Sequence, residues 1–472
     1  MSWEQPWGVR PTGHLSVLLP SVIKPRLHPT VSSGRIGDPN GAVWWKGAFH
    51  LFHQQNTTDP RGGASSWGHL TSTDLAHWVR HPTALEPRAD FGEEHIFSGS
   101  ARELPDGRLG LLFTVIYGGG RLPEQHLAVA DLDGAGNLVV DRTPGAVMTS
   151  GLHGGLDVEQ WRDPFLLEER GSVFAVTGGS IVREGEPRGS VLLYRCHDRW
   201  LREWTFEGVL FQHPEPAAWN IECPNFFPLA DAWVLLISPH DCPQYFVGAW
   251  DHGTNLFQPV RTDTLDSGAL YATQILRAPG EGQADILLGW IRTLPVGASE
   301  GWSGCHAFPR RLSLSPSKTL RQTVDPSVRQ FRAGALPEKF SGQAGDAGIE
   351  AWFDETAGEF VELEVGLGLE QCGGFDLHWG SEAGSINFHF DKGKGLLWVD
   401  GRKRWTGPGR SCIRLRVFLD RCALEIFEEE SGTAWTLVKP ELTAARREMR
   451  GKALGGTLRW EASAWRLEPA GK

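Results

Sequence analysis

Three acidic residues lie beside prolines in short, turn-like segments, and carboxyl groups placed in this way could cleave a glycosidic bond. Asp38 and Asp163 are each followed directly by proline, and Glu222 is followed by proline after one further residue. Glycosidic hydrolysis needs two carboxyl groups, one to attack or to activate water and one to protonate the leaving oxygen. Proline fixes the local chain and removes a competing N–H donor. We therefore expect these acids at strand ends, where side chains project into a site.

Each segment also has an ordinary structural explanation when it is taken alone. The sequence Asp-Pro-Asn-Gly at 38–41 is a common turn signal. Arg162 and Asp163 could form a local ion pair, and Glu222 could be an acid at a strand edge. The hypothesis of a hydrolytic site therefore depends on all three segments together.

The charge of the chain favours a neutral, sugar-like substrate. Its 472 residues include 57 Asp and Glu against 46 Lys and Arg, which gives a formal net charge of −11. Nucleic-acid binding needs clustered Lys and Arg, and the sequence has no such stripe. We therefore expect a small-molecule sugar as partner and no nucleic acid.

The apolar runs and the cysteines indicate a cytoplasmic protein without cofactors. No apolar stretch is as long as a membrane span, and the first residues lack the pattern of a signal peptide. The seven cysteines are scattered and form no Cys-x-x-Cys pair, which argues against a zinc site and against a disulfide framework. We expect no metal, no other cofactor, no membrane contact and a cytoplasmic location.

The elements that must position the three acids are predicted to be strands. Short apolar runs bounded by Gly, Pro, Asn and Asp recur along the chain. Such runs are 48–52, 109–115, 173–176, 191–194, 233–237, 360–365, 386–390 and 415–419. Helical periodicity is suggested only near 441–450. The fold is therefore expected to be all-β, and the regular spacing favours a sandwich, a barrel or a propeller.

The composition changes near residues 315–345, where we expect a linker between two domains. The segments 315–318 and 342–348 read as loops because they are rich in Ser, Pro or Gly. A chain of 472 residues is longer than one hydrophobic core usually serves. The alternating strands after the linker favour a β-sandwich.

The three acidic segments, taken in order, resemble those of the invertase family, glycoside hydrolase family 32, whose members cleave sucrose and fructans. The matching segments are Gly37–Gly41, Arg162–Pro164 and Glu222–Pro224. Further similar segments are 50–54, 67–78, 97–101, 265–274, 289–314 and 415–427. The resemblance runs from about residue 27 to residue 467.

The resemblance implies a fold and an activity. The fold would be a five-bladed β-propeller over residues 1–325, carrying the catalytic site, followed by a β-sandwich over residues 335–472. The activity would be retaining cleavage of β-fructofuranosidic bonds in sucrose, fructo-oligosaccharides or fructans, through a covalent fructosyl-enzyme. Asp38 would attack the anomeric carbon, and Glu222 would protonate the departing oxygen and then activate water. Asp163 would hold fructose hydroxyls and stabilise the transition state.

These roles require particular protonation states. In a retaining enzyme the two working carboxyl groups lie about 5–5.5 Å apart. Glu222 needs a raised pKa, which we expect from burial near Phe226 and Phe227 and from neighbouring carboxylates. Asp38 must stay ionised, so we expect it to accept hydrogen bonds from backbone amides.

The resemblance also implies a set of substrate-binding residues. They are Gly37, Gln54, Trp67, Phe97, Ser98, Arg162, Tyr271 and Trp302. Arg162 would anchor substrate hydroxyls or Asp163, and the aromatic side chains would line a sugar ring. Core packing explains Trp67 and Trp302 nearly as well.

The chain departs from the family pattern near the expected pocket. Gly37 stands where the family usually has an Asn that contacts the fructosyl unit, and Gly62 stands where many bacterial members have Trp. Asn225 replaces an Asp, which should lower the pKa of the acid/base. Residues 53–56 also differ from the corresponding segment of the family, which usually contains an aromatic residue. The natural substrate therefore stays open among sucrose, a fructan oligomer, a fructose dianhydride and a modified fructoside.

Other readings of the sequence stay open. A fructosyltransferase or a dianhydride-processing enzyme would use the same catalytic residues. An inverting propeller glycosidase of the arabinanase type also uses three carboxylates, and a non-catalytic sugar-binding propeller would keep only the fold. The sandwich is expected to be a brace or a dimer contact, and the protein a monomer or a homodimer.

Overall fold

Residues 34–324 form five separate sheets, and residues 338–466 form two more. The computed structural model describes residues 23–277, 285–294, 296–334, 338–345, 348–353, 358–381, 384–443 and 447–469, with backbone only for 349–353. The described residues are predominantly strand, with only short 3-10 turns between them. The predicted all-β fold is confirmed.

The five sheets each contain four or five strands, mostly in chain order. The first comprises β1 (Gly34–Trp45), β2 (Ala48–Asn56), β3 (Ser66–Ser72) and β4 (Val79–Leu85), with β19 (Trp302–Ser303) beside β1. The second comprises β5 (Glu93–Glu103), β6 (Leu109–Tyr117), β7 (Glu124–Leu132) and β8 (Leu138–Met148). The third comprises β9 (Val158–Glu169), β10 (Ser172–Arg183), β11 (Glu186–Cys196) and β12 (Trp204–Gln212).

The remaining two of these sheets continue the same order. The fourth comprises β13 (Glu222–Leu229), β14 (Ala232–Ser238), β15 (Gln244–Asp251) and β16 (Leu256–Thr264). The fifth comprises β17 (Leu270–Arg277), β18 (Asp285–Ile291), β20 (Cys305–His306), β21 (Arg310–Leu314) and β22 (Leu320–Val324). The short 3-10 turns are η1 (Ala89–Phe91), η2 (Ser150–His153), η3 (Ala298–Glu300), η4 (Pro326–Phe331) and η6 (Pro440–Thr443).

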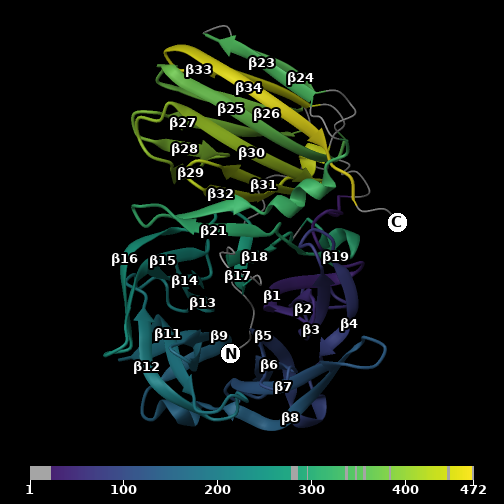
Figure 1. Ribbon diagram of the computed structural model, residues 1–472, viewed down its shortest axis with the longest axis vertical. Helices are drawn as coiled ribbons and strands as arrows, with labels where there is room; N and C mark the ends of the chain where they lie inside the picture. Colours follow the sequence, from purple (N-terminus) through teal and green to yellow (C-terminus); the bar gives the residue numbers. More distant parts are fainter. Residues whose placement is uncertain are drawn as a thin grey trace.

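The first strands of the five sheets surround a common centre. Strand β1 contacts β5, β5 contacts β9, β9 contacts β13, β13 contacts β17, and β17 contacts β1 again. Figure 1 shows these strands at the middle of the lower half, with the later strands of each sheet farther out. Side chains that leave the first strands toward the centre therefore meet one another.

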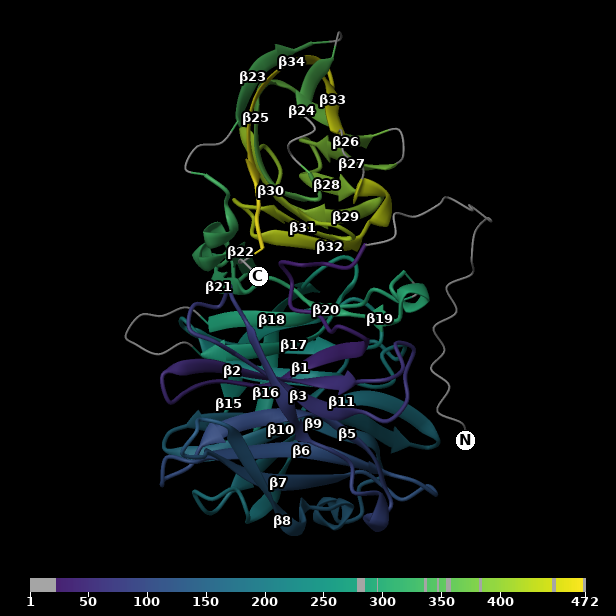
Figure 2. The ribbon, with the colours of Figure 1, turned by 90° about the vertical axis from the view of Figure 1, so that its right-hand side faces the viewer.

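The two six-stranded sheets pack face to face at the other end of the molecule (Figure 2). One contains β23 (Glu338–Ala344), β34 (Gly456–Arg466), β25 (Phe360–Cys372), β30 (Cys412–Asp420), β31 (Ala423–Glu428) and β32 (Thr433–Val438). The other contains β24 (Ile349–Phe353), β33 (Arg447–Ala453), β26 (Gly374–Ser381), β27 (Gly384–Asp391), β28 (Leu396–Val399) and β29 (Arg402–Trp405). Their facing apolar side chains, such as Leu363 and Phe388, form one buried core.

Two local predictions are wrong. The suggested helix near 441–450 is instead a 3-10 turn over Pro440–Thr443 and a strand that begins at Arg447, because the apolar side chains there alternate into the sandwich core. Gly342–Ala344 belongs to strand β23 rather than to a loop, since its backbone pairs with β34. The turn at 315–318 is confirmed as the connection of β21 and β22.

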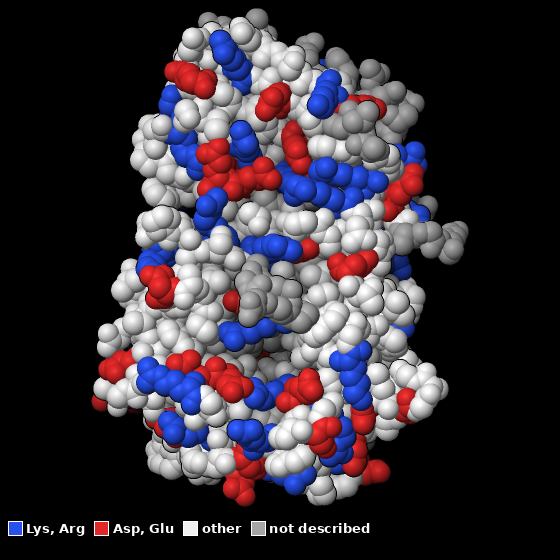
Figure 3. Space-filling view, in the orientation of Figure 1, with Lys and Arg blue, Asp and Glu red and all other residues white. Residues whose placement is uncertain are grey.

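The face of the molecule in Figure 3 carries charges of both signs. Lys and Arg are interspersed with Asp and Glu over most of it, and a row of Lys and Arg crosses the upper half. Over the described part of the chain, no helix has the length and the apolar character to cross a membrane.

A cluster of buried charges joins the N-terminal segment, the fifth sheet and the six-stranded sheet of β30 and β31. His28 contacts Asp420 at 2.8 Å and Glu425 at 2.9 Å, and all three side chains are fully buried. Arg310 of β21 pairs with Glu425 at 2.6 Å and with Asp266 at 2.8 Å. Burial alone would lower the pKa of His28, but hydrogen bonds and charges of Asp420 and Glu425 outweigh it and raise the pKa to about 9.

This raised pKa predicts how stability depends on pH. The His28 contribution is fully present below the ordinary histidine pKa of 6.5 and is lost as the pH rises through about 9. Urea unfolding should therefore show a falling free energy of unfolding between pH 7 and pH 10. In His28→Gln this fall should be smaller. The variant should also be about 3 kcal/mol less stable at pH 7, because buried Asp420 loses its cation while Glu425 keeps Arg310.

The matched control is His197→Gln, since His197 is exposed and bonds only Thr205 in the third sheet. Its stability should follow the wild-type curve. An unchanged pH dependence in His28→Gln would contradict the assignment of a charged His28.

Candidate active site

The three acids lie where the first strands of three sheets depart from regular pairing. Asp38 falls in a pairing irregularity between β1 and β2, and Glu222 opens β13 at another. Asp163 has a φ of +61° and lies opposite an irregularity between β9 and β10. Such bulges turn a side chain out of the regular alternation and are common beside active sites. The prediction of strand ends is therefore confirmed for Glu222 and wrong for Asp38 and Asp163, which lie inside strands.

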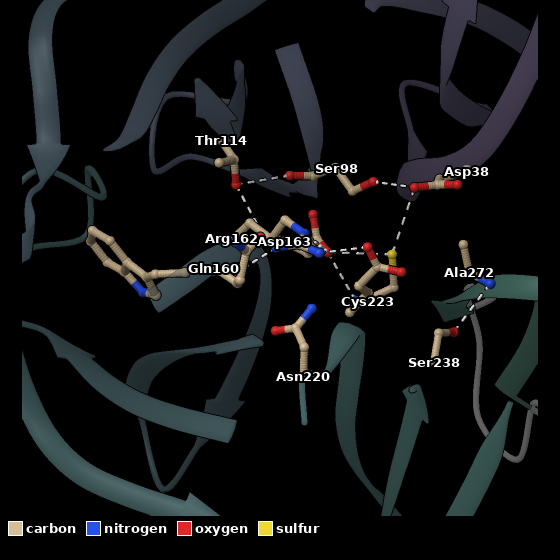
Figure 4. Close-up of polar contacts among 12 residues, drawn as sticks. Asp38, Ser98, Thr114, Gln160, Arg162, Asp163, Asn220, Cys223, Ser238 and Ala272 are labelled. Atoms are coloured by element: carbon tan, nitrogen blue, oxygen red, sulfur yellow. Dashed lines mark hydrogen bonds and ion pairs between the residues drawn. The ribbon is translucent and has the colours of Figure 1, made fainter. Parts of the chain in front are cut away.

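Asp38 is contacted by side chains of the second and fourth sheets. Its Oδ2 accepts a hydrogen bond from the Ser98 hydroxyl at 2.8 Å, and the Cys223 thiol lies 3.8 Å from the same oxygen (Figure 4). No backbone amide among the described residues bonds this carboxyl, so the predicted amide contacts are wrong. Burial and the charge of Glu222 raise the pKa of Asp38, whereas the charge of Arg35 and the bonds from Ser98 and Cys223 oppose this rise.

Asp163 lies between Asp38 and Arg162, on the far side of the Cys223 thiol. Its Oδ2 accepts the Cys223 backbone N–H at 3.0 Å and lies 3.6 Å from the Cys223 sulfur. Its own backbone N–H donates to the Thr114 hydroxyl at 2.9 Å. Burial raises the pKa of Asp163 to about 7, although the Arg162 charge opposes the rise.

Glu222 is held in its ionised form. Its Oε1 accepts a hydrogen bond from Arg162 Nη2 at 2.5 Å, and its Oε2 accepts one from the Tyr271 hydroxyl. His240 Nδ1 lies 3.5 Å from Oε2. Burial favours the neutral form of Glu222, but the charges of Arg162 and His240 and these hydrogen bonds outweigh it and lower the pKa. The predicted raised pKa of Glu222 is therefore wrong, because the charge of Arg162, together with that of His240 and the hydrogen bonds, has a larger effect than the burial predicted near Phe226 and Phe227.

Most of the predicted binding residues are brought together around the acids. Gln54 donates to the Ser98 hydroxyl at 3.0 Å, and Arg162 and Tyr271 both bond Glu222. Gly37 directly precedes Asp38, and its carbonyl accepts a bond from buried His306 at 2.9 Å. Phe97, which precedes Ser98, is half-buried.

Two tryptophans that were predicted to line the sugar ring, Trp67 and Trp302, lie outside the site. Trp67 is fully buried in the core between the first two sheets, and its ring N–H donates to the Phe97 carbonyl. Trp302 is 1% exposed, packs with Ile23 and Cys422, and donates to Glu300. Both tryptophans are structural, so core packing is the correct explanation for them.

Sequence reasoning missed four residues that belong to the site. Trp290 of β18 packs with Cys223 and Tyr271, and Arg35 lies over its ring with 5.4 Å between guanidinium carbon and ring centroid. His240, beside Glu222, stacks on Trp219 with ring centroids 5.0 Å apart and planes 4° apart. The sequence held a signal for two of these residues. Trp290 lies in the family-like segment 289–314, and Arg35 lies two residues before Gly37, on the same face of a strand. No sequence signal pointed to His240 or Trp219.

The departure at position 225 has a structural explanation. Asn225 is 2% exposed, and its amide donates to the carbonyls of Cys223 and Thr273, while its oxygen accepts the Ile275 N–H. The neutral amide therefore ties β13 to β17 instead of acting on Glu222 as a charge. Nothing among the described residues explains Gly62, which has no neighbour within 4 Å of an added Cβ.

The described side chains carry no evident metal site. No group of three or more His, Cys, Asp or Glu within the described ranges is arranged to hold a metal ion.

Comparison with known proteins identifies relatives over most of the chain. The family described as "Glycosyl hydrolases family 32 N-terminal domain" matches residues 28–324. An Escherichia coli sucrose-6-phosphate hydrolase is 28% identical over 442 residues, which cover 85% of this chain and 86% of that protein. An Escherichia coli raffinose invertase is 28% identical over 492 residues, covering 94% and 95%.

Solved structures show the same fold. A Bombyx mori beta-fructofuranosidase superposes with a TM-score of 0.76 at 24% identity, covering 95% of this chain and 94% of that one. A sucrose-6-phosphate hydrolase from Lactobacillus gasseri superposes with a TM-score of 0.79 at 23% identity, covering 95% and 93%. The likeness extends over both the five small sheets and the two larger ones.

Proposed function

We propose that this chain, which belongs to glycosyl hydrolase family 32, is a glycosidase that cleaves β-fructofuranosidic bonds with retention through a covalent fructosyl-enzyme. The observation that carries the proposal is the meeting of three carboxyls from three sheets, Asp163 buried and Asp38 and Glu222 half-buried, with Cys223 in contact with Asp38 and Asp163. A glycosidase needs two such groups, and the third can hold the sugar.

The roles follow from the contacts of each carboxyl. Asp38 is the nucleophile, because one of its oxygens is bonded to Ser98 and no ion pair with another described residue would have to break. Glu222 is the acid/base, and Asp163 binds sugar hydroxyls. The separation of about 5–5.5 Å between the Asp38 and Glu222 carboxyls stays a prediction.

Glu222 must gain a proton before it can act as an acid. In the free protein Arg162 holds it ionised at 2.5 Å. We propose that substrate hydroxyls take over the Arg162 hydrogen bonds, which removes the strongest cause of the low pKa of Glu222.

The leaving group would depart on the side of Trp219 and His240. His240 lies 3.5 Å from Glu222, and Trp219 is 41% exposed and stacked on the His240 ring. An exposed aromatic face beside the acid suits the apolar face of a sugar ring. The relatives named sucrose-6-phosphate hydrolase and raffinose invertase indicate leaving groups to test: a glucosyl unit, its phosphate and a longer oligosaccharide.

The arrangement of the sheets supports a proposal for the architecture of the two domains. We propose that the five sheets are the blades of a five-bladed β-propeller within residues 1–325 and that residues 335–472 are a β-sandwich domain. The ring of contacts among β1, β5, β9, β13 and β17 supports this count. A cytoplasmic location and a monomeric or homodimeric state stay predictions.

The test is a screen of the purified protein against sucrose, sucrose-6-phosphate, raffinose, inulin and levan, with chromatography of the products. We expect release of fructose, or of a fructose-containing unit, from at least one of them at about 1–1,000 turnovers per second. Proton NMR of the first-formed product should show the β anomer.

The outcomes separate the alternatives. Growing oligosaccharides at high substrate concentration would favour a fructosyltransferase, and the inverted anomer would exclude the covalent intermediate. A wild-type protein that binds a fructoside without cleaving any of these substrates would refute the enzymatic proposal.

A further inference from the structure

Arg35 occupies the space beside the nucleophile that Gly37 leaves open. The two residues lie on the same strand, and a Cβ atom built on Gly37 would stand 3.5 Å from Nη2 and 3.6 Å from Nε of Arg35. The guanidinium also lies over the Trp290 ring, with its carbon 5.4 Å from the centroid. A larger side chain at position 37 would therefore compete with Arg35 for this space.

Arg35 is a half-buried cation without an ion pair among the described residues. Its one direct hydrogen bond is a long one, from Nη2 to Gln54 Oε1 at 3.5 Å. Burial lowers the pKa of Arg35, and the negative charge of Asp38 opposes that change. The charge that Arg35 feels most strongly is therefore that of Asp38, although no atoms of the two groups are in hydrogen-bond contact.

A chain of hydrogen bonds connects the two residues. Arg35 donates to Gln54 Oε1, Gln54 Nε2 donates to Ser98 Oγ at 3.0 Å, and Ser98 Oγ donates to Asp38 Oδ2 at 2.8 Å. A guanidinium can only donate, so it fixes which end of the Gln54 amide accepts and which end donates. The amide N–H then occupies a lone pair of the Ser98 oxygen, and the hydroxyl proton points to Asp38.

We propose that Arg35 is a positioning residue for the nucleophile: through Gln54 and Ser98 it fixes the direction of the hydrogen bonds that end on Asp38, and its charge favours the ionised carboxylate. This proposal rests on the proposed function of Asp38. A charge-based role is favoured over binding of an anionic substrate, because three carboxyls already face only two guanidiniums in the site.

The proposal predicts the kinetics of Arg35→Gln. Its kcat/KM on the best substrate should fall about 10- to 100-fold, mostly in kcat. The acid limb of its pH profile should move to higher pH, since Asp38 without the nearby cation stays protonated to higher pH. Arg35→Lys keeps the charge and should recover the acid limb but not the full kcat.

The matched control is Arg195→Gln. Arg195 also lies over an aromatic ring, 5.1 Å from Phe174, and it pairs with Glu207 at 3.5 Å in the third sheet, away from the acids. This variant should keep both the rate and the pH profile.

A readout that does not use turnover separates this inference from the proposed function. Carboxyl-¹³C NMR titration of Asp-labelled protein, with Asp38→Asn to assign the resonance, should give a higher pKa for Asp38 in Arg35→Gln. An unchanged Asp38 titration, or Arg35→Lys behaving like Arg35→Gln, would overturn the proposal even if the enzyme is active. If Arg35→Gln does not fold, Arg35→Met removes the same charge with an apolar side chain of similar reach, and an unchanged Asp38 titration there would also overturn it.

Discussion

Asp38→Asn is expected to lower kcat on the best fructoside substrate by about 10⁴-fold or more. The Asn amide is a very weak nucleophile, so the fructosyl-enzyme cannot form. The fold should survive, because the Asn oxygen can still accept the Ser98 hydrogen bond that Asp38 Oδ2 accepts now. The side chain is also neutral, and burial already disfavours a charge at this position.

The measurement is steady-state hydrolysis together with substrate binding by calorimetry. Binding should persist in Asp38→Asn, with a Kd within a few-fold of the wild-type KM, since the groups that hold the sugar remain. Denaturation and trapping should yield a fructosyl adduct from the wild type and none from the variant. Full activity in Asp38→Asn, confirmed by mass spectrometry to exclude deamidation, would remove Asp38 from the nucleophile role.

Glu222→Gln is expected to lower kcat by about 10³-fold on substrates with a sugar leaving group. The loss should be much smaller on a fructoside with an acidic phenol as leaving group, because such a group departs without a proton. Azide should restore part of the activity, since it attacks the fructosyl-enzyme without a general base. The dependence on leaving group distinguishes an acid/base from a residue that only binds substrate.

The same variant also tests the contact between Arg162 and Glu222. Glutamine removes the partner of a buried guanidinium that is bonded to Glu222 at 2.5 Å and to the Gln160 carbonyl at 2.9 Å. Loss of stability in Glu222→Gln should therefore be modest, because Gln160 still holds the arginine. The control is Glu94→Gln at the exposed start of β5, which should keep activity on every leaving group. Equal losses on sugar and phenol leaving groups would contradict the assignment of Glu222.

The fold class followed from the sequence because strand periodicity is local. Runs such as 109–115 and 233–237 lie inside β6 and β14, where burial on the faces of a sheet selects β-branched and aromatic residues. The stretch at 441–450 misled because its spacing of apolar residues fits a short helix as well as a strand. Pairing of β33 with β24 and β26, both far away in the sequence, decides the outcome.

The positions of the three acids could be predicted, but their protonation could not. Motifs identify residues, whereas a pKa depends on which charges the fold brings near. Asp163 and Glu222 differ because Arg162 points its guanidinium at Glu222 and lies farther, at 3.8 Å, from Asp163. The role of Arg35 likewise depends on the bulge at Asp38, which no local pattern reveals.

The prolines that follow the three acids also bear on strand pairing. Each acid lies on the first strand of its sheet, and the inner edge of β1 pairs with β19 over only Gly34 and Arg35. The first strands of neighbouring sheets contact one another around the common centre, and a strand edge is a template for pairing with another strand. Pro39, Pro164 and Pro224 carry no N–H, so they interrupt that template at the places where catalysis needs the strands open. The residues that shape the site thus also disfavour pairing between the sheets that surround it.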